Sequence, residues 1–156
     1  MNRQTPEQRL AEAGLALPPP PKPSANYVGC RRIGQLLFVA GHGPKHEDGS
    51  YVCGRINGPE DVERGYAAAR LAALNMLATL KSELGDLDQV AGVLKVLGMV
   101  NADPDFKAHP KVIDGFSDIL TQAFGEGAAH ARSAVGMGSL PHGMSVEVEA
   151  IFHLKP

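Results

Sequence analysis

One arginine stands apart in the C-terminal third of the chain. Arg132 is the only Lys or Arg between Val112 and Leu154, and the residues at positions 131, 133, 134 and 136 are small. Small neighbours leave room for a ligand, and a guanidinium group can hold a carboxylate or a phosphate through two hydrogen bonds. The sequence therefore predicts an anion-binding arginine at position 132.

Two glutamates follow on the next predicted strand. Glu147 and Glu149 lie on the face opposite an apolar stripe. If this strand pairs with the strand of Arg132 in a hairpin around Pro141, one carboxylate lies near the guanidinium group. It would then orient Arg132 or act on a bound water. The alternative is an internal salt bridge between Arg132 and a glutamate, and spacing alone favours it.

Motifs for most other chemistries are missing from the sequence. There is no GxGxxG, GxxxxGK[ST], GxSxG or HExxH. Only His42 and His46 share a metal-ligand spacing, and they straddle Pro44 in a predicted turn, where we interpret them as solvated residues. We therefore expect neither a metal nor a cofactor.

Composition restricts the classes of partner. A chain of 156 residues, 44% hydrophobic and 21% charged, is typical of one compact domain. A net charge of −2, no Trp and 5% aromatic residues argue against nucleic acid as a partner. No apolar run approaches the roughly 20 residues that span a bilayer, so we expect no membrane association. The N-terminus MNRQTPEQRL lacks the apolar core of a signal peptide, so we expect a cytoplasmic protein.

The elements that must position these residues follow from the apolar pattern. Residues 1–26 read as an extended Pro-rich segment with a short helix over 6–13, and residues 27–156 read as the domain. Within the domain, apolar periodicity and turn residues predict two helices and five strands. The predicted strands are 36–39, 50–56, 90–100, 131–137 and 146–154, and the predicted helices are 59–84 and 110–124.

The order of these elements, ββαβαββ, predicts the fold class. It favours an α+β domain, in which one mixed sheet carries both helices on one face, over a doubly wound fold.

The two ends of the domain resemble one family. Arg132-Ser-Ala-Val, then Leu140-Pro141 and Val146-Glu-Val-Glu-Ala, resemble the C-terminal signature of the RidA family (reactive intermediate deaminase, also YjgF or endoribonuclease L-PSP). Tyr27-Val28, Gly34, the run 36–39, Ala40-Gly41 and Pro44 are similar to its opening hairpin. The resemblance covers about residues 27–156.

The resemblance implies a fold, an assembly and an activity. Family members have a chorismate-mutase-like fold and form homotrimers with a small-molecule site in each cleft between subunits. Active members hydrolyse enamines and imines, such as 2-aminoacrylate, to a 2-keto acid and ammonia. By this resemblance Arg132 holds the substrate carboxylate, Glu147 positions the water, Tyr27 lines the pocket and Gly41 lies beside it.

Three positions depart from the family pattern. Ala40, Ala134 and Ile113 stand where deaminase members have a serine, a cysteine and an asparagine. The anion anchor is kept while the wall of the pocket becomes apolar. Two functions follow: hydrolysis of imines of a more hydrophobic carboxylate, or a trimer that binds a small carboxylate without turnover. Ribonuclease activity is discounted, because it needs a basic groove or stacking aromatic residues.

Overall fold

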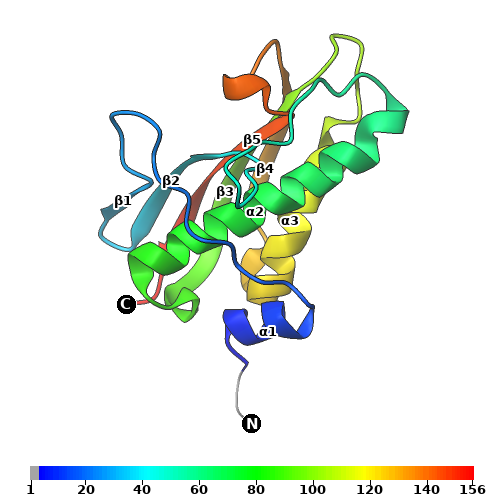
Figure 1. The fold of residues 1–156 in the computed structure, drawn as a ribbon. Coiled ribbons are helices and arrows are strands. Elements are labelled where there is room, and N and C mark those ends of the chain that lie inside the picture. Colours follow the sequence, from blue (N-terminus) through cyan, green and yellow to red (C-terminus); the bar gives the residue numbers. More distant parts are fainter. Residues whose placement is uncertain (1–3) are drawn as a thin grey trace.

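The computed structural model describes residues 4–156, and its centre is one five-stranded mixed sheet (Figure 1). The strands lie in the order β1-β2-β5-β3-β4. All neighbours are antiparallel except β3 and β4, which are parallel. The strands are β1 (Cys30–Ile33), β2 (Leu36–His42), β3 (Val90–Asn101), β4 (Ala131–Met137) and β5 (Val146–Leu154).

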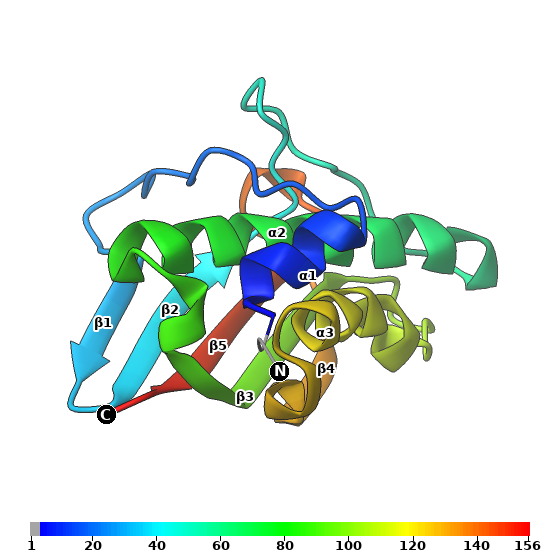
Figure 2. The same ribbon diagram turned by 90° about the horizontal axis from the view of Figure 1, so that it is seen from below.

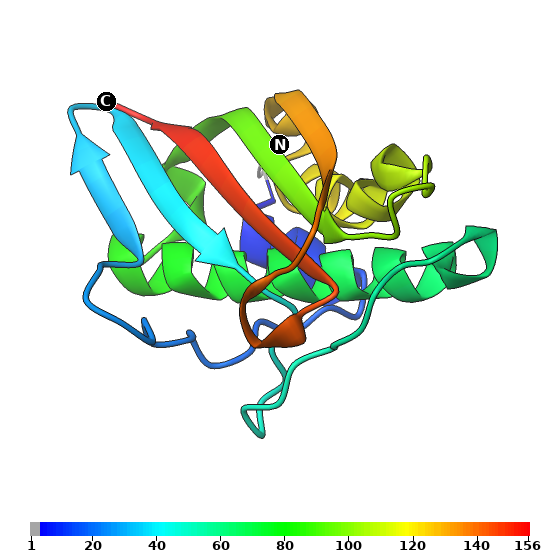
Figure 3. The ribbon, with the colours of Figure 1, turned by 90° about the horizontal axis from the view of Figure 1, so that it is seen from above.

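Two long helices cover one face of this sheet. These are α2 (Val62–Leu84) and α3 (His109–Phe124), and both lie on the same side of the strands (Figures 2 and 3). The core between helices and sheet is mainly apolar, with Met76, Phe116 and Phe152 fully buried. The predicted ββαβαββ order with two helices on one face is therefore confirmed. No helix within residues 4–156 is long and apolar enough to cross a membrane.

Strand β5 alternates between buried apolar residues and residues that face away from the helices. Its alternate residues from Val146 to Leu154 are at most 3% exposed and face the helices. Glu147 and Glu149 alternate with them and therefore face the other way. The predicted apolar stripe is thus confirmed, and it fixes the glutamates on the open face of the sheet.

One predicted strand and one predicted pairing are wrong. Residues 50–56 form no strand, because Tyr51, Cys53 and Ile56 each make an isolated bridge to a different segment. Strand β1, which the apolar pattern did not predict, pairs with β2 as the opening hairpin. The hairpin of β4 with β5 is also absent, because β3 lies between them and hydrogen-bonds to both.

A short N-terminal helix, α1 (Pro6–Glu12), docks on the far side of α2 and α3 (Figure 1). Thr5 and Gln8 form a capping box at its start, and Leu10 is buried in the core. Arg9 donates a hydrogen bond to the Ala123 carbonyl, and Glu7 accepts one from the Leu87 amide. The Pro-rich stretch that follows runs along α2 toward the start of β1.

The open face of the sheet carries exposed apolar side chains beside charged ones such as Glu149 and Lys95. Phe38, Val135 and Met137 are 41%, 40% and 37% exposed, and Ile33 at the tip of the first hairpin is 66% exposed. No element of residues 4–156 covers this face (Figure 3).

Candidate functional site

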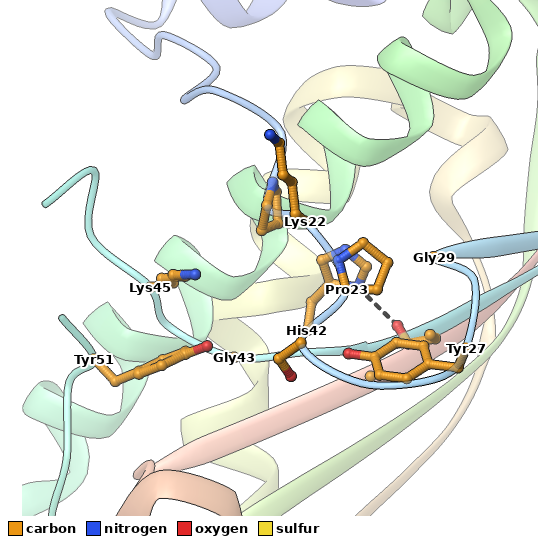
Figure 4. Close-up of a pocket in the computed structure, with 12 residues that line it drawn as sticks. Lys22, Pro23, Tyr27, Gly29, His42, Gly43, Lys45 and Tyr51 are labelled. Carbon is orange, nitrogen blue, oxygen red and sulfur yellow. Dashed lines mark hydrogen bonds between the residues drawn. The ribbon is translucent and has the colours of Figure 1, made fainter. Parts of the chain in front are cut away.

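Three of the predicted site residues meet in one pocket at the end of β2. Tyr27, Ala40 and Gly41 line it together with the end of the Pro-rich segment, and Lys45 and Tyr51 close the opposite side (Figure 4). In this view the hydroxyl groups of Tyr27 and Tyr51 point toward one another from the two sides. The pocket therefore has an aromatic, hydroxyl-bearing wall at each end.

Glu147 of β5 lies beside this pocket, in contact with Gly41, and is not itself one of the residues that line it. Its carboxylate lies where a Cβ atom at Gly41 would be, so only glycine allows the approach. The register between β2 and β5 shifts between Val39 and His42, which places Gly41 in an irregular stretch of the strand. The resulting contact holds the carboxylate against the β2 backbone.

The environment of Glu147 favours its neutral form. The side chain is half-buried, and its desolvation raises the pKa of the carboxyl group, with a further increase from the negative charge of Glu149. A carboxyl group with a raised pKa can accept and return a proton more evenly than an exposed glutamate. Glu147 is thus suited to proton transfer.

Helix α2 holds the end of β2 in place through buried polar side chains. The His42 ring bonds the Ala40 carbonyl at 2.7 Å through Nδ1 and the Thr79 hydroxyl at 2.8 Å through Nε2. Asn75, which is 3% exposed, donates to the carbonyls of Gly43 at 3.2 Å and Lys45 at 2.9 Å. Residues 40–45 are therefore fixed relative to α2.

The interpretation of His42 as a solvated turn residue is wrong. It is 6% exposed, and desolvation lowers its pKa, so the neutral ring is favoured. His46 is exposed at the tip of the following turn. No cluster of three or more His, Cys, Asp or Glu side chains in residues 4–156 could hold a metal ion.

Arg132 lies elsewhere, on β4, and faces helix α3. Its Nη1 donates to Asp114 at 2.9 Å and to the Ser117 hydroxyl at 3.0 Å, and Nη2 donates to the Pro110 carbonyl at 3.3 Å. Ser117 is also within hydrogen-bond distance of His130. The Arg132 side chain is 21% exposed, and Nε–H has no hydrogen-bond partner within residues 4–156. One donor of Arg132 thus remains unpaired.

Arg132 and Glu147 lie on opposite faces of the sheet. Arg132 is in register with Val96, which is buried beneath the helices, whereas Glu147 is in register with Met99 on the open face. The predicted proximity of Arg132 to a glutamate of β5 is therefore wrong within one chain. Its ion pair is with Asp114 of α3 instead.

The two remaining predicted residues belong to the Arg132 side. Ala134 lies two residues along β4 and packs against the edge of the core. Ile113 is fully buried against Gly98, where a Cβ atom would come 2.6 Å from its side chain. Its assignment to a binding site needs correction, because a side chain buried between α3 and β3 cannot reach a ligand.

Asp114 and Ser117 are the polar partners of Arg132 that sequence reasoning missed. They are three residues apart on α3, a spacing that places both side chains on one helix face. This spacing is the feature of the sequence that could have predicted a polar patch on the helix.

Comparison with known proteins agrees with this architecture. Residues 7–148 match the model of the YjgF/chorismate mutase-like endoribonuclease family. The protein TCP17 of Trypanosoma cruzi is 39% identical over 146 residues, which is 93% of this chain and 91% of that protein.

Two solved structures are similar over nearly their whole length. Atu1372 from Agrobacterium tumefaciens, a protein of unknown function, superposes with a TM-score of 0.86 at 39% identity, covering 97% of this chain and 94% of that one. A candidate endoribonuclease from Shewanella oneidensis superposes with a TM-score of 0.91 at 34% identity, covering 97% and 100%. With the fold, the opening hairpin and the C-terminal strands all in agreement, the chain belongs to the YjgF/chorismate mutase-like endoribonuclease family.

Proposed function

We propose that the protein hydrolyses imines and enamines of small carboxylic acids to 2-keto acids and ammonia. The observation that carries this proposal is the half-buried carboxyl group of Glu147, which lies against Gly41 at the edge of a small pocket and has a raised pKa. A proton-transfer group held beside a cavity is what this reaction requires.

In the proposed reaction, Glu147 takes a proton from water as the water oxygen attacks the carbon of the C=N bond. The imine reacts in its form protonated on nitrogen, so the electron pair of the C=N bond moves to nitrogen and gives a neutral carbinolamine. Glu147 then returns its proton to this nitrogen and takes the proton of the carbinolamine hydroxyl as the C=O bond forms. The C–N bond breaks, ammonia leaves, and Glu147 releases its remaining proton to solvent. Fixing one water and one carbon atom is sufficient for a large acceleration, because imines already hydrolyse in water.

The substrate carboxylate is bound by Arg132 of a neighbouring copy. Within one chain Arg132 and Glu147 face opposite sides of the sheet, so both can act on one substrate only if two copies meet. The exposed apolar side chains of the open face, among them Phe38 and Val135, favour such an assembly. We therefore propose a homotrimer with a site in each cleft between subunits.

Binding of a small carboxylate without turnover is the second candidate. Two observations favour it: Ala40 lines the pocket where deaminase members have a serine, and Asp114 already occupies part of the Arg132 guanidinium. Cleavage of RNA has less support, because the chain has a net charge of −2 and no Trp.

The test is the release of ammonia from 2-imino acids generated in the assay, measured over side chains of increasing size. An acceleration over the uncatalysed rate that disappears in Glu147→Gln supports hydrolysis. Saturable binding of 2-keto acids with no acceleration for any imine supports binding alone.

A further inference from the structure

We propose that Lys45 binds a second carboxylate of the substrate, so that the preferred substrates are imines of 2-keto dicarboxylic acids. This inference rests on the proposed function and adds to it the substrate class. It is carried by the position of one unpaired ammonium group in the pocket that holds Tyr27 and Gly41.

Lys45 faces this pocket as a free cation. Its amine is directed toward the middle of the pocket in Figure 4, and Nζ lies 5.6 Å from the centre of the Tyr51 ring. None of the salt bridges within residues 4–156 involves it, although its residue is partly buried. Positive charge that is partly desolvated and unpaired favours an anionic ligand.

The protein holds Lys45 in this place from both sides. Its carbonyl accepts a hydrogen bond of 2.9 Å from the buried Asn75, which fixes the backbone. Tyr51 is stacked on His142 with 5.1 Å between ring centroids and 6° between planes, which fixes the ring beneath the amine. The backbone of Lys45 and the ring beside its amine are therefore preorganised, so binding an anion orders mainly the Lys45 side chain.

The end of the Pro-rich segment, residues 21–24, forms the roof of the pocket and does not direct a second cation into it. Lys22 also lines the pocket, but Figure 4 shows its amine directed away from the other labelled side chains. In the proposed assembly, Arg132 of a neighbouring copy binds the carboxylate next to the imine carbon. Lys45 then binds a carboxylate at the other end of the same molecule, across the aromatic wall formed by Tyr27 and Tyr51.

The experiment compares two 2-keto acids that differ only in the second carboxylate. Binding of 2-oxoglutarate and of 2-oxopentanoate is measured by calorimetry on the assembled protein, with both acids five carbons long. We expect 2-oxoglutarate to bind about tenfold or more tightly, the range of one charged hydrogen bond. Lys45→Met should abolish this difference by weakening 2-oxoglutarate alone, and Lys45→Arg should restore most of it.

Lys22→Met is the matched control, because it removes the same charge from the roof of the pocket. It should leave most of the difference between the two acids. Equal affinity of the wild-type protein for both acids, or a preference that survives Lys45→Met, overturns the proposal. These results concern binding only, so failure of the proposed hydrolysis would be recognised separately, by the lack of ammonia release from any imine.

Discussion

Glu147 of β5 and Gly41 of β2 contact one another in a way that only glycine permits, since a Cβ atom at position 41 would overlap the Glu147 carboxylate. The contact joins the irregular end of β2 to the half-buried carboxyl group of Glu147 on β5. The group that would collide is the far end of a flexible side chain, so a methyl group at position 41 would displace the carboxylate rather than unfold the sheet.

Gly41→Ala should therefore separate activity from stability. We expect a loss of about 100-fold in kcat/KM, the scale of a 1 Å misplacement of a reacting group, with a nearly unchanged melting temperature. Ammonia release and thermal unfolding measure the two effects. Gly138→Ala is the control, because nothing lies within 4 Å of a Cβ atom there. A fully active Gly41→Ala protein would show that the position of Glu147 does not matter.

The two glutamates of β5 should differ in their effect on the pH profile. The raised pKa of Glu147 means that its basic form is lost already above the pH at which an exposed glutamate protonates. The acidic limb of kcat/KM should thus lie above the usual glutamate range. Glu149→Gln removes the repulsion that contributes to the raised pKa of Glu147. In this variant the acidic limb should move to lower pH, and activity should be retained. Glu147→Gln should remove both the acidic limb and most of the rate. Equal losses from the two substitutions would contradict the assignment of Glu147.

The proposed role of Arg132 predicts that Asp114 competes with a carboxylate ligand for its guanidinium group. The ion pair between them is 2.9 Å long and Asp114 is 52% exposed, so Asp114→Asn should free the guanidinium without large loss of stability. We expect the Kd for 2-oxopentanoate to fall about threefold to tenfold, and to rise about tenfold or more in Arg132→Lys, which loses the planar fork. Asp118→Asn, one turn further along α3, serves as the control. If Asp114→Asn and Asp118→Asn behave alike in calorimetry, Arg132 is structural.

A site shared between copies can be tested by complementation. Arg132→Ala and Glu147→Gln proteins should each be inactive alone. Co-expressed in equal amounts, they should form mixed trimers in which a site is intact when it takes its arginine from one variant and its glutamate from the other. The subunit that supplies the arginine carries an intact Arg132 in half of the cases, and the subunit that supplies the glutamate carries an intact Glu147 in half of the cases. About a quarter of the sites are therefore intact, and about a quarter of the wild-type rate is expected. Mixed assemblies without activity would exclude a site between subunits, as would a monomer near 16.5 kDa in light scattering.

Asn75 should contribute strongly to stability. Its buried amide donates to the carbonyls of Gly43 and Lys45, so Asn75→Ala leaves both without this donor. We expect the free energy of unfolding to fall by about 1 to 3 kcal/mol in a denaturant titration with an unchanged slope. Asn57→Ala is the control, since that amide is exposed and donates to the Arg55 carbonyl. A loss no larger than that of the control would mean that water replaces the bonds of Asn75.

Most of the fold was predictable from local patterns. The long helix was expected over 59–84 and is found at Val62–Leu84 after a short 3₁₀ turn, and the strand expected over 90–100 ends one residue later, at Asn101. Strands β4 and β5 have the predicted bounds. Residues 50–56 carry a strand-like composition but bridge to three separate segments, and such long-range pairing is not encoded in the composition of the segment itself.

The candidate site was predictable only in part, for a topological reason. Arg132 and Glu147 are singled out by residue type, but their relative position depends on which strand lies between them. Consecutive strands pair more often than not, and here β3 intervenes, which turns an expected contact into two opposite faces. Lys45 gave no signal in the sequence, because its place in the pocket depends on a buried hydrogen bond from a residue 30 positions away.

The N-terminal helix has a consequence for the order in which the chain folds. Glu7 and Arg9 bind backbone groups 80 and 114 residues further along the chain, so the docking surface of α1 is synthesised long after α1 itself. A helix of seven residues is too short to persist alone in water. Its docking, and with it the placement of the Pro-rich roof over the pocket of Tyr27 and Gly41, is therefore a late folding event that only chains with a finished α3 can complete.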